Sequence, residues 1–261
     1  MTPKAGSPHT RQTKRYGWLP DLPDQRDLLY TAPPPPAAEL PPLVDLRPLC
    51  PAVYDQGDLG SCTAQAIAGA IEFDMLRQGL PAFTPSRLFI YYNERVIEHC
   101  VDVDHGAMPR DGIKVVAGLG APPESDWPYD VDRFAEEPPQ RAFRDARRHR
   151  VSRYERLSRD LGHMRGCLAS GFPFVFGFAV YEGFEGPGVR RTGRLDLPGR
   201  KERLIGGHAV LAVGYRDRDR RFLVRNSWGP GFGMDGYFSI PYDYLLERRL
   251  SADFWTIRLV S

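Results

Sequence analysis

The sequence predicts an α+β protein, because the spacing of its apolar residues changes partway along the chain. The first part has helical spacing, and the second part has short runs typical of strands. Residues 1–42 fit neither pattern, since they are polar and rich in proline. We therefore expect a tail over 1–42 and a folded domain over 43–261, with a helical lobe over about 43–148 and a β-rich lobe over about 149–261.

The tail contains one segment with enough apolar bulk to pack on a protein surface. This segment, 16–30, reads YGWLPDLPDQRDLLY, and its bulky apolar residues are Trp18, Leu19, Leu28 and Tyr30. Prolines at 33–36 and 41–42 follow it and favour an extended polyproline conformation. Two interpretations stay open: a semi-ordered tail, and a short pro-segment that covers a cleft and inhibits the protein itself.

Five helices are expected from apolar spacing and end signals. The first begins at Cys62 and ends near Gly79, with apolar residues along one face. Thr84-Pro85 begins the second, because Thr caps a helix and Pro suits its first position. The others are expected over 111–119, 140–148 and 160–169, the last with Asp160 as its cap.

Strand-like runs fill most of the second half. They are 151–156, 173–180, 208–215, 221–226, 236–240 and 253–259. If this half packs against the helical half, residues from both can share a site at the seam.

Bulk properties exclude several classes of function. The formal net charge of +2 is too small to suggest a nucleic-acid or membrane partner. No apolar run approaches the length of a membrane span, and the first thirty residues show no secretory signal. We therefore expect a monomeric, cytoplasmic protein. A reducing compartment leaves thiols free by default, although a Cys50–Cys100 bridge stays open.

Three short motifs, far apart in the chain, together contain the parts of a nucleophilic site. Cys62 lies in QGDLGSCTA, His208 in GGHAV and Asn226 in NSWG. A thiol, an imidazole and a carboxamide can act as nucleophile, base and orienting group. Gln56, six residues before Cys62, adds a donor suited to an oxyanion.

Each position suits its role. At a helix start, Cys62 meets unpaired N–H groups and the positive end of the helix dipole, both of which favour a thiolate. His208 begins a strand, which is a rigid mount, and Asn226 ends another strand, so antiparallel pairing can bring the two together. We expect pairing with an imidazolium to lower the pKa of the Cys62 thiol.

These motifs resemble those of papain-like cysteine peptidases, of the bacterial type with CTA where plant and lysosomal enzymes have CWA. The resemblance covers roughly 43–261 and rests on VDLRP at 44–48, Gln56, Gly60-Ser61-Cys62, Gly207-His208-Ala209, Asn226-Ser227-Trp228-Gly229 and Gly236-Tyr237. Three features depart from the family: Thr63 replaces an aromatic residue, Leu59 replaces a disulfide cysteine, and 1–42 is too short for the long helical pro-region of plant and lysosomal relatives.

The resemblance implies a fold with a helical left lobe and a β-barrel right lobe on either side of the active-site cleft. It implies Cys62 as nucleophile, His208 as its base, Asn226 as orienter, and Gln56 with the Cys62 amide as the oxyanion hole. The expected reaction is hydrolysis of peptide or protein substrates through an acyl-enzyme, with no metal or organic cofactor.

Two other functions stay open. The same thiol acyl-enzyme would serve a transpeptidase or amidase, and the scaffold could be a non-catalytic binding protein whose cleft is covered by 16–30. The presence of all four site residues argues against a pure binder.

A second polar cluster invites a metal-binding interpretation. It consists of His99, Cys100, Asp102, Asp104 and His105. Its spacing matches no common zinc pattern, so we expect a solvated loop there and no metal.

Overall fold

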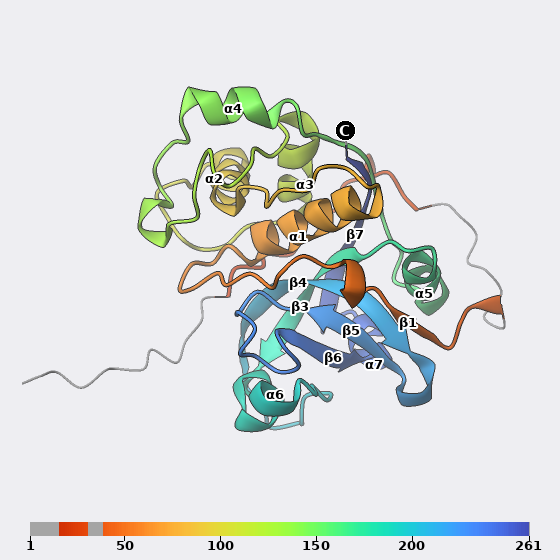
Figure 1. Cartoon of the computed structure of the whole chain (residues 1–261). Helices are drawn as coiled ribbons and strands as arrows, with labels where there is room; N and C mark the ends of the chain where they lie inside the picture. The colour runs from red at the N-terminus through yellow and green to blue at the C-terminus, as the bar shows by residue number, and fades with distance from the viewer. Residues whose placement is uncertain (1–15, 31–38, 261) are drawn as a thin grey trace, which may run out of the picture.

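The computed structural model describes residues 16–30 and 39–260. Helices α1 to α4 gather on one side of the molecule and most of the sheet lies on the other, with α5, α6 and α7 around the sheet (Figure 1). The expected polyproline segment at 33–36 and the tail before Tyr16 lie outside the described residues.

The described residues contain the five predicted helices and two further short ones. The helices are α1 (Cys62–Arg77), α2 (Arg87–Ile97), α3 (Pro109–Gly118), α4 (Gln140–Ala146), α5 (Leu161–Ala169), α6 (Pro187–Thr192) and α7 (Tyr242–Leu246). Single 3₁₀ turns occur at Arg47–Leu49, Val131–Arg133, Glu182–Glu185 and Asp217–Asp219. Within the two described ranges, no helix is both long enough and apolar enough to cross a membrane.

The start of α2 differs from the prediction. Ser86 is the cap, because its side-chain oxygen accepts a hydrogen bond from the Phe89 N–H at 3.2 Å. Thr84 and Pro85 lie before the helix, and Pro85 instead pairs with Pro123 in an isolated bridge. Asp160 does cap α5, since its carboxylate accepts the His163 N–H at 2.9 Å.

All six predicted runs are strands of one antiparallel sheet, which a short first strand joins. The strands are β1 (Leu43–Asp45), β2 (Val151–Arg156), β3 (Phe174–Tyr181), β4 (Leu204–Arg216), β5 (Arg221–Arg225), β6 (Tyr237–Pro241) and β7 (Ser251–Val260). Their order is β2-β7-β3-β4-β5-β6, and β1 pairs with β4.

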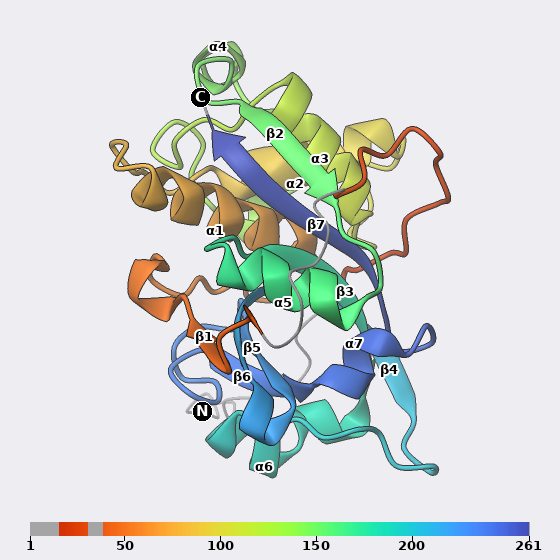
Figure 2. The same cartoon turned by 90° about the vertical axis from the view of Figure 1, so that its right-hand side faces the viewer.

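The β-rich lobe is an open sheet and not the closed barrel that was expected. Across the described residues, the edge strands β2 and β6 do not pair. The long strand β7 explains this, because its first part pairs with β3 and its last part with β2. The far part of β7 therefore carries β2 beside the helical lobe and away from β6 (Figure 2).

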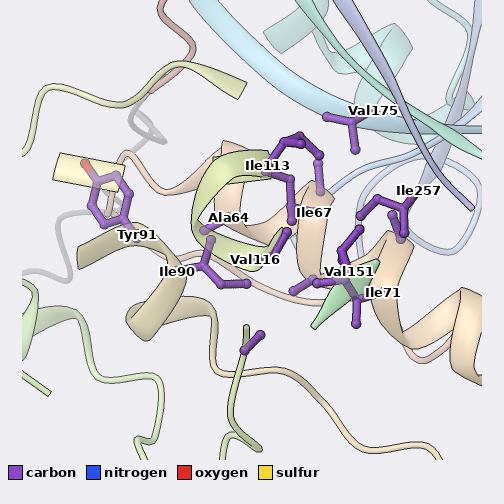
Figure 3. Packing of buried hydrophobic residues seen from close by; sticks show 14 of the residues in the cluster. Ala64, Ile67, Ile71, Ile90, Tyr91, Ile113, Val116, Val151, Val175 and Ile257 are labelled. Carbon is purple, nitrogen blue, oxygen red and sulfur yellow. The ribbon is translucent and has the colours of Figure 1, made fainter. Parts of the chain in front are cut away.

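Strand alternation builds a separate core on each face of the sheet. Side chains at successive strand positions point to opposite faces. Val175 and Leu211 join the cluster formed with α1, whereas Phe176 and Val210 join the cluster on the other face. Figure 3 shows the first cluster, where Ile67 of α1 lies between the helical lobe and the sheet. This packing fixes the start of α1 against β4.

Candidate active site

Cys62 is the first residue of α1 and is completely buried. Its Sγ accepts a hydrogen bond from the backbone N–H of Ala209 at 3.3 Å. Ala209 follows His208 in β4, so the thiol lies beside the strand segment that carries the imidazole. The helical lobe thus supplies the thiol, and the sheet supplies the imidazole, as the sequence predicted.

His208 and Asn226 are joined by a direct hydrogen bond. Nε2 of His208 lies 2.8 Å from Oδ1 of Asn226, and both side chains are buried. Oδ1 also accepts the N–H of Ser227 at 2.9 Å, which fixes which end of the amide faces the ring. Because Oδ1 can only accept, Nε2 carries the proton, and Nδ1 is the nitrogen on the other side of the ring.

Aromatic side chains surround this hydrogen bond. The ring of Trp228 lies 5.1 Å from the imidazole of His208, centroid to centroid, with an angle of 36° between the planes. Phe178 lies 5.9 Å from the same ring, from the side of β3. Trp228 therefore shields the His208–Asn226 pair with apolar surface.

Gln56 is brought to the site by pairing between two loops. Its backbone N–H donates to the Ser227 carbonyl at 2.9 Å, and its side-chain Oε1 accepts the Ser227 hydroxyl at 2.7 Å. Nε2 then donates to the carbonyl of Leu59 at 2.8 Å, just before Cys62. Gln56 is fully buried, so its amide is held in one orientation between the two motifs.

The thiol does not have the lowered pKa that the sequence suggested. Burial raises the pKa of Cys62 to about 12, because the surrounding protein disfavours the charged thiolate. Backbone N–H groups of Ala209, Gly17 and Thr63 act in the opposite direction, since they stabilise a negative sulfur. One of them, Gly17, belongs to the N-terminal tail, so part of the burial comes from the tail itself.

The described part of the tail, 16–30, crosses the site, and we call it the strap. The backbone N–H of Trp18 donates to the Gly207 carbonyl at 3.0 Å. Ala107 donates its N–H to the Gly17 carbonyl at 2.8 Å and accepts the N–H of Leu19 at 3.0 Å. The strap therefore adds main-chain pairing to both sides of the cleft, with Gly17 next to the Cys62 thiol.

The strap begins over the imidazole. The ring of Tyr16 lies 6.2 Å from that of His208 and 6.0 Å from that of Trp228, and its hydroxyl donates to Glu185. Neither Tyr16 nor Gly17 was singled out by sequence reasoning, because nothing in their local pattern indicates a partner almost two hundred residues away.

Carboxylates anchor the middle of the strap. Asp27 forms a double hydrogen bond to the guanidinium of Arg110, at 2.8 and 2.6 Å, and also accepts from Arg156. The carboxylate of Asp21 accepts hydrogen bonds from the backbone N–H of Arg110 and from the indole N–H of Trp255, each at 2.9 Å. The Asp27–Arg110 ion pair is largely shielded from water, which makes it stronger than an exposed one.

Of the four apolar residues predicted to pack on the protein surface, Tyr30 is buried and Leu28 is exposed. Tyr30 is buried beside β2, and its N–H donates to the Arg156 carbonyl at 2.8 Å. Leu28 is 61% exposed, and only its backbone takes part, through a carbonyl that accepts the Arg156 N–H. The prediction that Leu28 packs by its side chain was wrong.

Hydrogen bonds from Asp104 join two loops near the cleft. Asp104 accepts the Gly60 N–H at 3.0 Å and the Tyr91 hydroxyl at 2.6 Å, which ties the loop before Cys62 to the loop that carries Ala107. Leu59 is buried in the adjoining core. Thr63, in place of an aromatic residue, donates its hydroxyl to the buried Glu94 at 2.8 Å.

The four cysteines are free thiols. The Cys50–Cys100 bridge that stayed open is not formed, and the two thiols contact the carbonyls of Leu46 and Arg95 instead. Cys167 is buried in the core on the far face of the sheet from α1.

Part of the predicted solvated loop is more compact than expected. One ligand-type atom from each of Glu98, Cys100 and His105 lies within 4.8 Å of the others. Glu98 already accepts the Met108 N–H at 2.7 Å, and Nδ1 of His105 lies 3.0 Å from the Gly106 carbonyl. Both residues thus help to shape the loop before Ala107, and absence of a metal stays a prediction.

Comparison with known proteins places this geometry among characterised folds. The family described as papain family cysteine protease matches residues 40–245. An uncharacterized peptidase C1-like protein of Acanthamoeba polyphaga mimivirus is 40% identical, over 95% of this chain and 88% of its own length.

Solved structures of cysteine proteases have the same fold as this chain. Xylellain, a cysteine protease from Xylella fastidiosa, is 46% identical with a TM-score of 0.88, over 94% of this chain and 96% of its own. Procathepsin L 3 of Tenebrio molitor, 19% identical with a TM-score of 0.68, covers 88% of this chain and 73% of its own and shares the fold.

Proposed function

Because the chain belongs to the papain family of cysteine proteases, we propose that it hydrolyses peptide bonds with Cys62 as nucleophile, His208 as general base and Asn226 as the group that orients the base. The observation that carries this proposal is the 2.8 Å bond from His208 to Asn226, with the Cys62 thiol bound to the next residue of the same strand.

Each proposed step follows from these positions. Nδ1 of His208 takes the thiol proton, and the sulfur attacks the substrate carbonyl carbon. The resulting oxyanion accepts hydrogen bonds from the Cys62 N–H, at the start of α1, and from Nε2 of Gln56. An amide nitrogen carries two protons, and we assign the one not donated to Leu59 to this role.

Collapse of the tetrahedral intermediate completes acylation. The C–N bond breaks, and the imidazolium of His208 returns its proton to the leaving amine. A water molecule, deprotonated by His208, then attacks the thioester, which releases the acid and the free thiol. Throughout, Asn226 keeps Nε2 protonated and the ring in place.

The test is hydrolysis of a peptide–aminocoumarin library and of unfolded protein. Cys62→Ala should abolish turnover, and His208→Ala should lower kcat by about 10²- to 10⁴-fold. Cys50→Ser, which changes a partly buried free thiol outside the site, is the matched control and should keep wild-type rates. Products that carry a new free carboxylate support hydrolysis, whereas products joined to an added amine would favour the transpeptidase alternative. Activity that survives in Cys62→Ala would contradict the proposal.

We also propose that the strap inhibits the chain to which it belongs. It presents the Gly17 N–H to the thiol, and the Gly17 carbonyl oxygen is bound by Ala107. Full burial of Cys62 and His208 is consistent with this, because a substrate needs access to both.

A further inference from the structure

Ser61 occupies the cap position of α1, but its side chain does not cap the helix. A serine at this position ordinarily accepts a hydrogen bond from the N–H of the second or third helical residue. Here Oγ of Ser61, which is completely buried, lies 2.6 Å from the hydroxyl of Tyr129, in the loop between α3 and α4. The first N–H groups of α1 are therefore left to other partners, and that of Thr63 is hydrogen-bonded to the Cys62 sulfur.

The hydrogen bonds around Tyr129 form a chain with one direction. The Tyr129 hydroxyl donates to the backbone carbonyl of Gln56 at 2.9 Å, because a carbonyl can only accept. Its oxygen therefore accepts the Ser61 hydroxyl proton, and Oγ of Ser61 accepts from Nε2 of Gln65 at 3.1 Å. Oε1 of Gln65 accepts from Nη1 of Arg87, also at 3.1 Å, and a guanidinium can only donate. Every donor between Arg87 and the Gln56 carbonyl is thus fixed.

Arg87 begins this chain from a rigid position. It is the first residue of α2 and is only 8% exposed. Its guanidinium donates to both carboxylate oxygens of Glu124. The same guanidinium lies over the rings of Tyr54 and Tyr129, at 4.7 and 4.4 Å from their centroids. An ion pair in the plane of the guanidinium and aromatic rings against its faces hold it in one orientation.

The chain of hydrogen bonds ends at the two segments that supply the proposed oxyanion donors. One donor is the side chain of Gln56, and the other is the backbone N–H of Cys62, which follows Ser61. The Tyr129 hydroxyl is bonded to the Gln56 carbonyl and to the Ser61 side chain, so a single group ties these segments together. Donors stabilise an oxyanion most when they are fixed before the charge forms, because no reorganisation then opposes the reaction.

We propose that Tyr129 is a positioning residue that fixes both oxyanion donors, and that the hydrogen bonds from Arg87 hold it in place. This inference rests on the proposed peptidase function. Without the Tyr129 hydroxyl, the Gln56 loop loses a tie, and the Ser61 hydroxyl is free to turn back and cap α1. That cap would compete with the Cys62 sulfur for the Thr63 N–H. Because the oxyanion exists only during the reaction, the loss falls on kcat and not on KM.

The experiment measures kcat and KM of the full-length chain for a dipeptide aminocoumarin, in a double-mutant cycle of Tyr129→Phe and Gln56→Ala. A strap docked in the same chain competes with the substrate, so it raises KM and leaves kcat at saturating substrate unchanged. We expect Tyr129→Phe to lower kcat by about 10-fold and to change KM by less than about twofold. In the Gln56→Ala chain, where one positioned donor is already missing, Tyr129→Phe should lower kcat by less than about threefold.

Two further variants complete the set. Tyr92→Phe, at a partly exposed tyrosine of α2, is the matched control and should keep the wild-type kcat and KM. Ser61→Ala removes only the hydroxyl between Gln65 and Tyr129, and we expect a smaller loss of kcat than in Tyr129→Phe. Because both changes break the same chain of hydrogen bonds, Ser61→Ala/Tyr129→Phe should be no slower than Tyr129→Phe alone.

The outcomes separate the two proposals. Circular dichroism shows whether Tyr129→Phe is folded; if it is not, Ser61→Ala decides, and a wild-type kcat in that variant overturns the inference. Equal fractional losses of kcat from Tyr129→Phe with and without Gln56, or a raised KM at wild-type kcat, overturn the positioning role while the peptidase function stands. Absence of turnover in the wild-type chain would overturn the proposed function and this inference with it.

Discussion

Gly17 and Gly60 touch backbone to backbone: a Cβ atom built on Gly17 would stand 1.7 Å from the Gly60 carbonyl oxygen. Gly60 lies two residues before Cys62, and the backbone N–H of the same Gly17 is hydrogen-bonded to the Cys62 thiol. A backbone oxygen held by the start of α1 cannot move aside as a flexible side chain could. The fit of the strap therefore depends on glycine at position 17.

Gly17→Ala should displace the strap and raise peptidase activity in the full-length chain. The reason is steric, since the added methyl group overlaps the Gly60 carbonyl. The measurement is kcat/KM for a dipeptide aminocoumarin. Leu22→Ala is the matched control on the strap, because Leu22 is 68% exposed, and it should leave the rate unchanged. Equal activity of Gly17→Ala and wild type would contradict self-inhibition.

Gln56→Ala should lower kcat by about 10²- to 10³-fold if its amide stabilises the oxyanion. KM should change little, because a ground-state carbonyl carries less negative charge than the intermediate. Ser227→Ala offers a graded comparison, since it removes only the hydroxyl that holds Oε1 of Gln56, and we expect a smaller loss. A Gln56→Ala variant that keeps the wild-type kcat would remove Gln56 from the mechanism.

Binding of the strap to the cleft should become weaker as the pH is raised from about 4 to about 6. Burial, together with the neighbouring Asp253 carboxylate, raises the pKa of Asp21 from 3.8 to about 6 in the docked strap. A raised pKa means that docking favours the protonated carboxyl, so this contribution is complete below the ordinary pKa and is lost as the pH rises through the raised one.

The charged groups around Asp21 do not reverse this direction. Burial also raises the pKa of Asp253. Burial acts in the same sense on Asp27, but hydrogen bonds from Arg110 and Arg156 prevail and lower its pKa, so its contribution is lost only at more acidic pH. Between pH 4 and pH 6, the pH dependence of strap docking is therefore set by the acids whose pKa is raised, Asp21 and Asp253.

A synthetic peptide of residues 16–30 measures this effect in trans, as an inhibitor of the Gly17→Ala chain. Between pH 4.5 and pH 6.5 its Ki should rise by roughly tenfold relative to that of the same peptide with Asp21→Asn. The substituted peptide cancels any pH dependence of the enzyme itself. If the Ki values of the two peptides changed with pH by the same factor across this range, the assignment to Asp21 would be contradicted.

The chemistry of the site could be predicted from sequence because it lies in contiguous motifs. Cys62, His208 and Asn226 stand beside glycines and strand ends whose local meaning is readable, and the structure brings them together with Gln56. The central strands β3 and β4 could be predicted because both faces of the sheet are buried there, which leaves near-continuous apolar runs. The catalytic roles themselves stay predictions, as do the cytoplasmic location and the monomeric state.

What could not be predicted depends on contacts between distant residues. Trp18 and Asp253, joined by a hydrogen bond from the indole N–H to a carboxylate oxygen, are 235 residues apart, and neither has a local pattern that names the other. The open sheet follows from how β7 divides its pairing between β3 and β2, which alternation of side chains does not encode. The cap of α2 was misplaced because Ser86 bonds to Pro122, a tertiary contact that overrides the Thr-Pro signal.

The state of the thiol is the central claim, and alkylation tests it most directly. Iodoacetamide at about pH 5.5, mapped by peptide mass spectrometry, reacts with a thiolate–imidazolium pair and leaves ordinary thiols almost untouched. We expect little labelling of Cys62 in the wild-type chain, where the strap buries it, and selective labelling in Gly17→Ala that disappears in Gly17→Ala/His208→Ala. Cys62 that stays unlabelled in Gly17→Ala, or that labels equally without His208, would contradict this account.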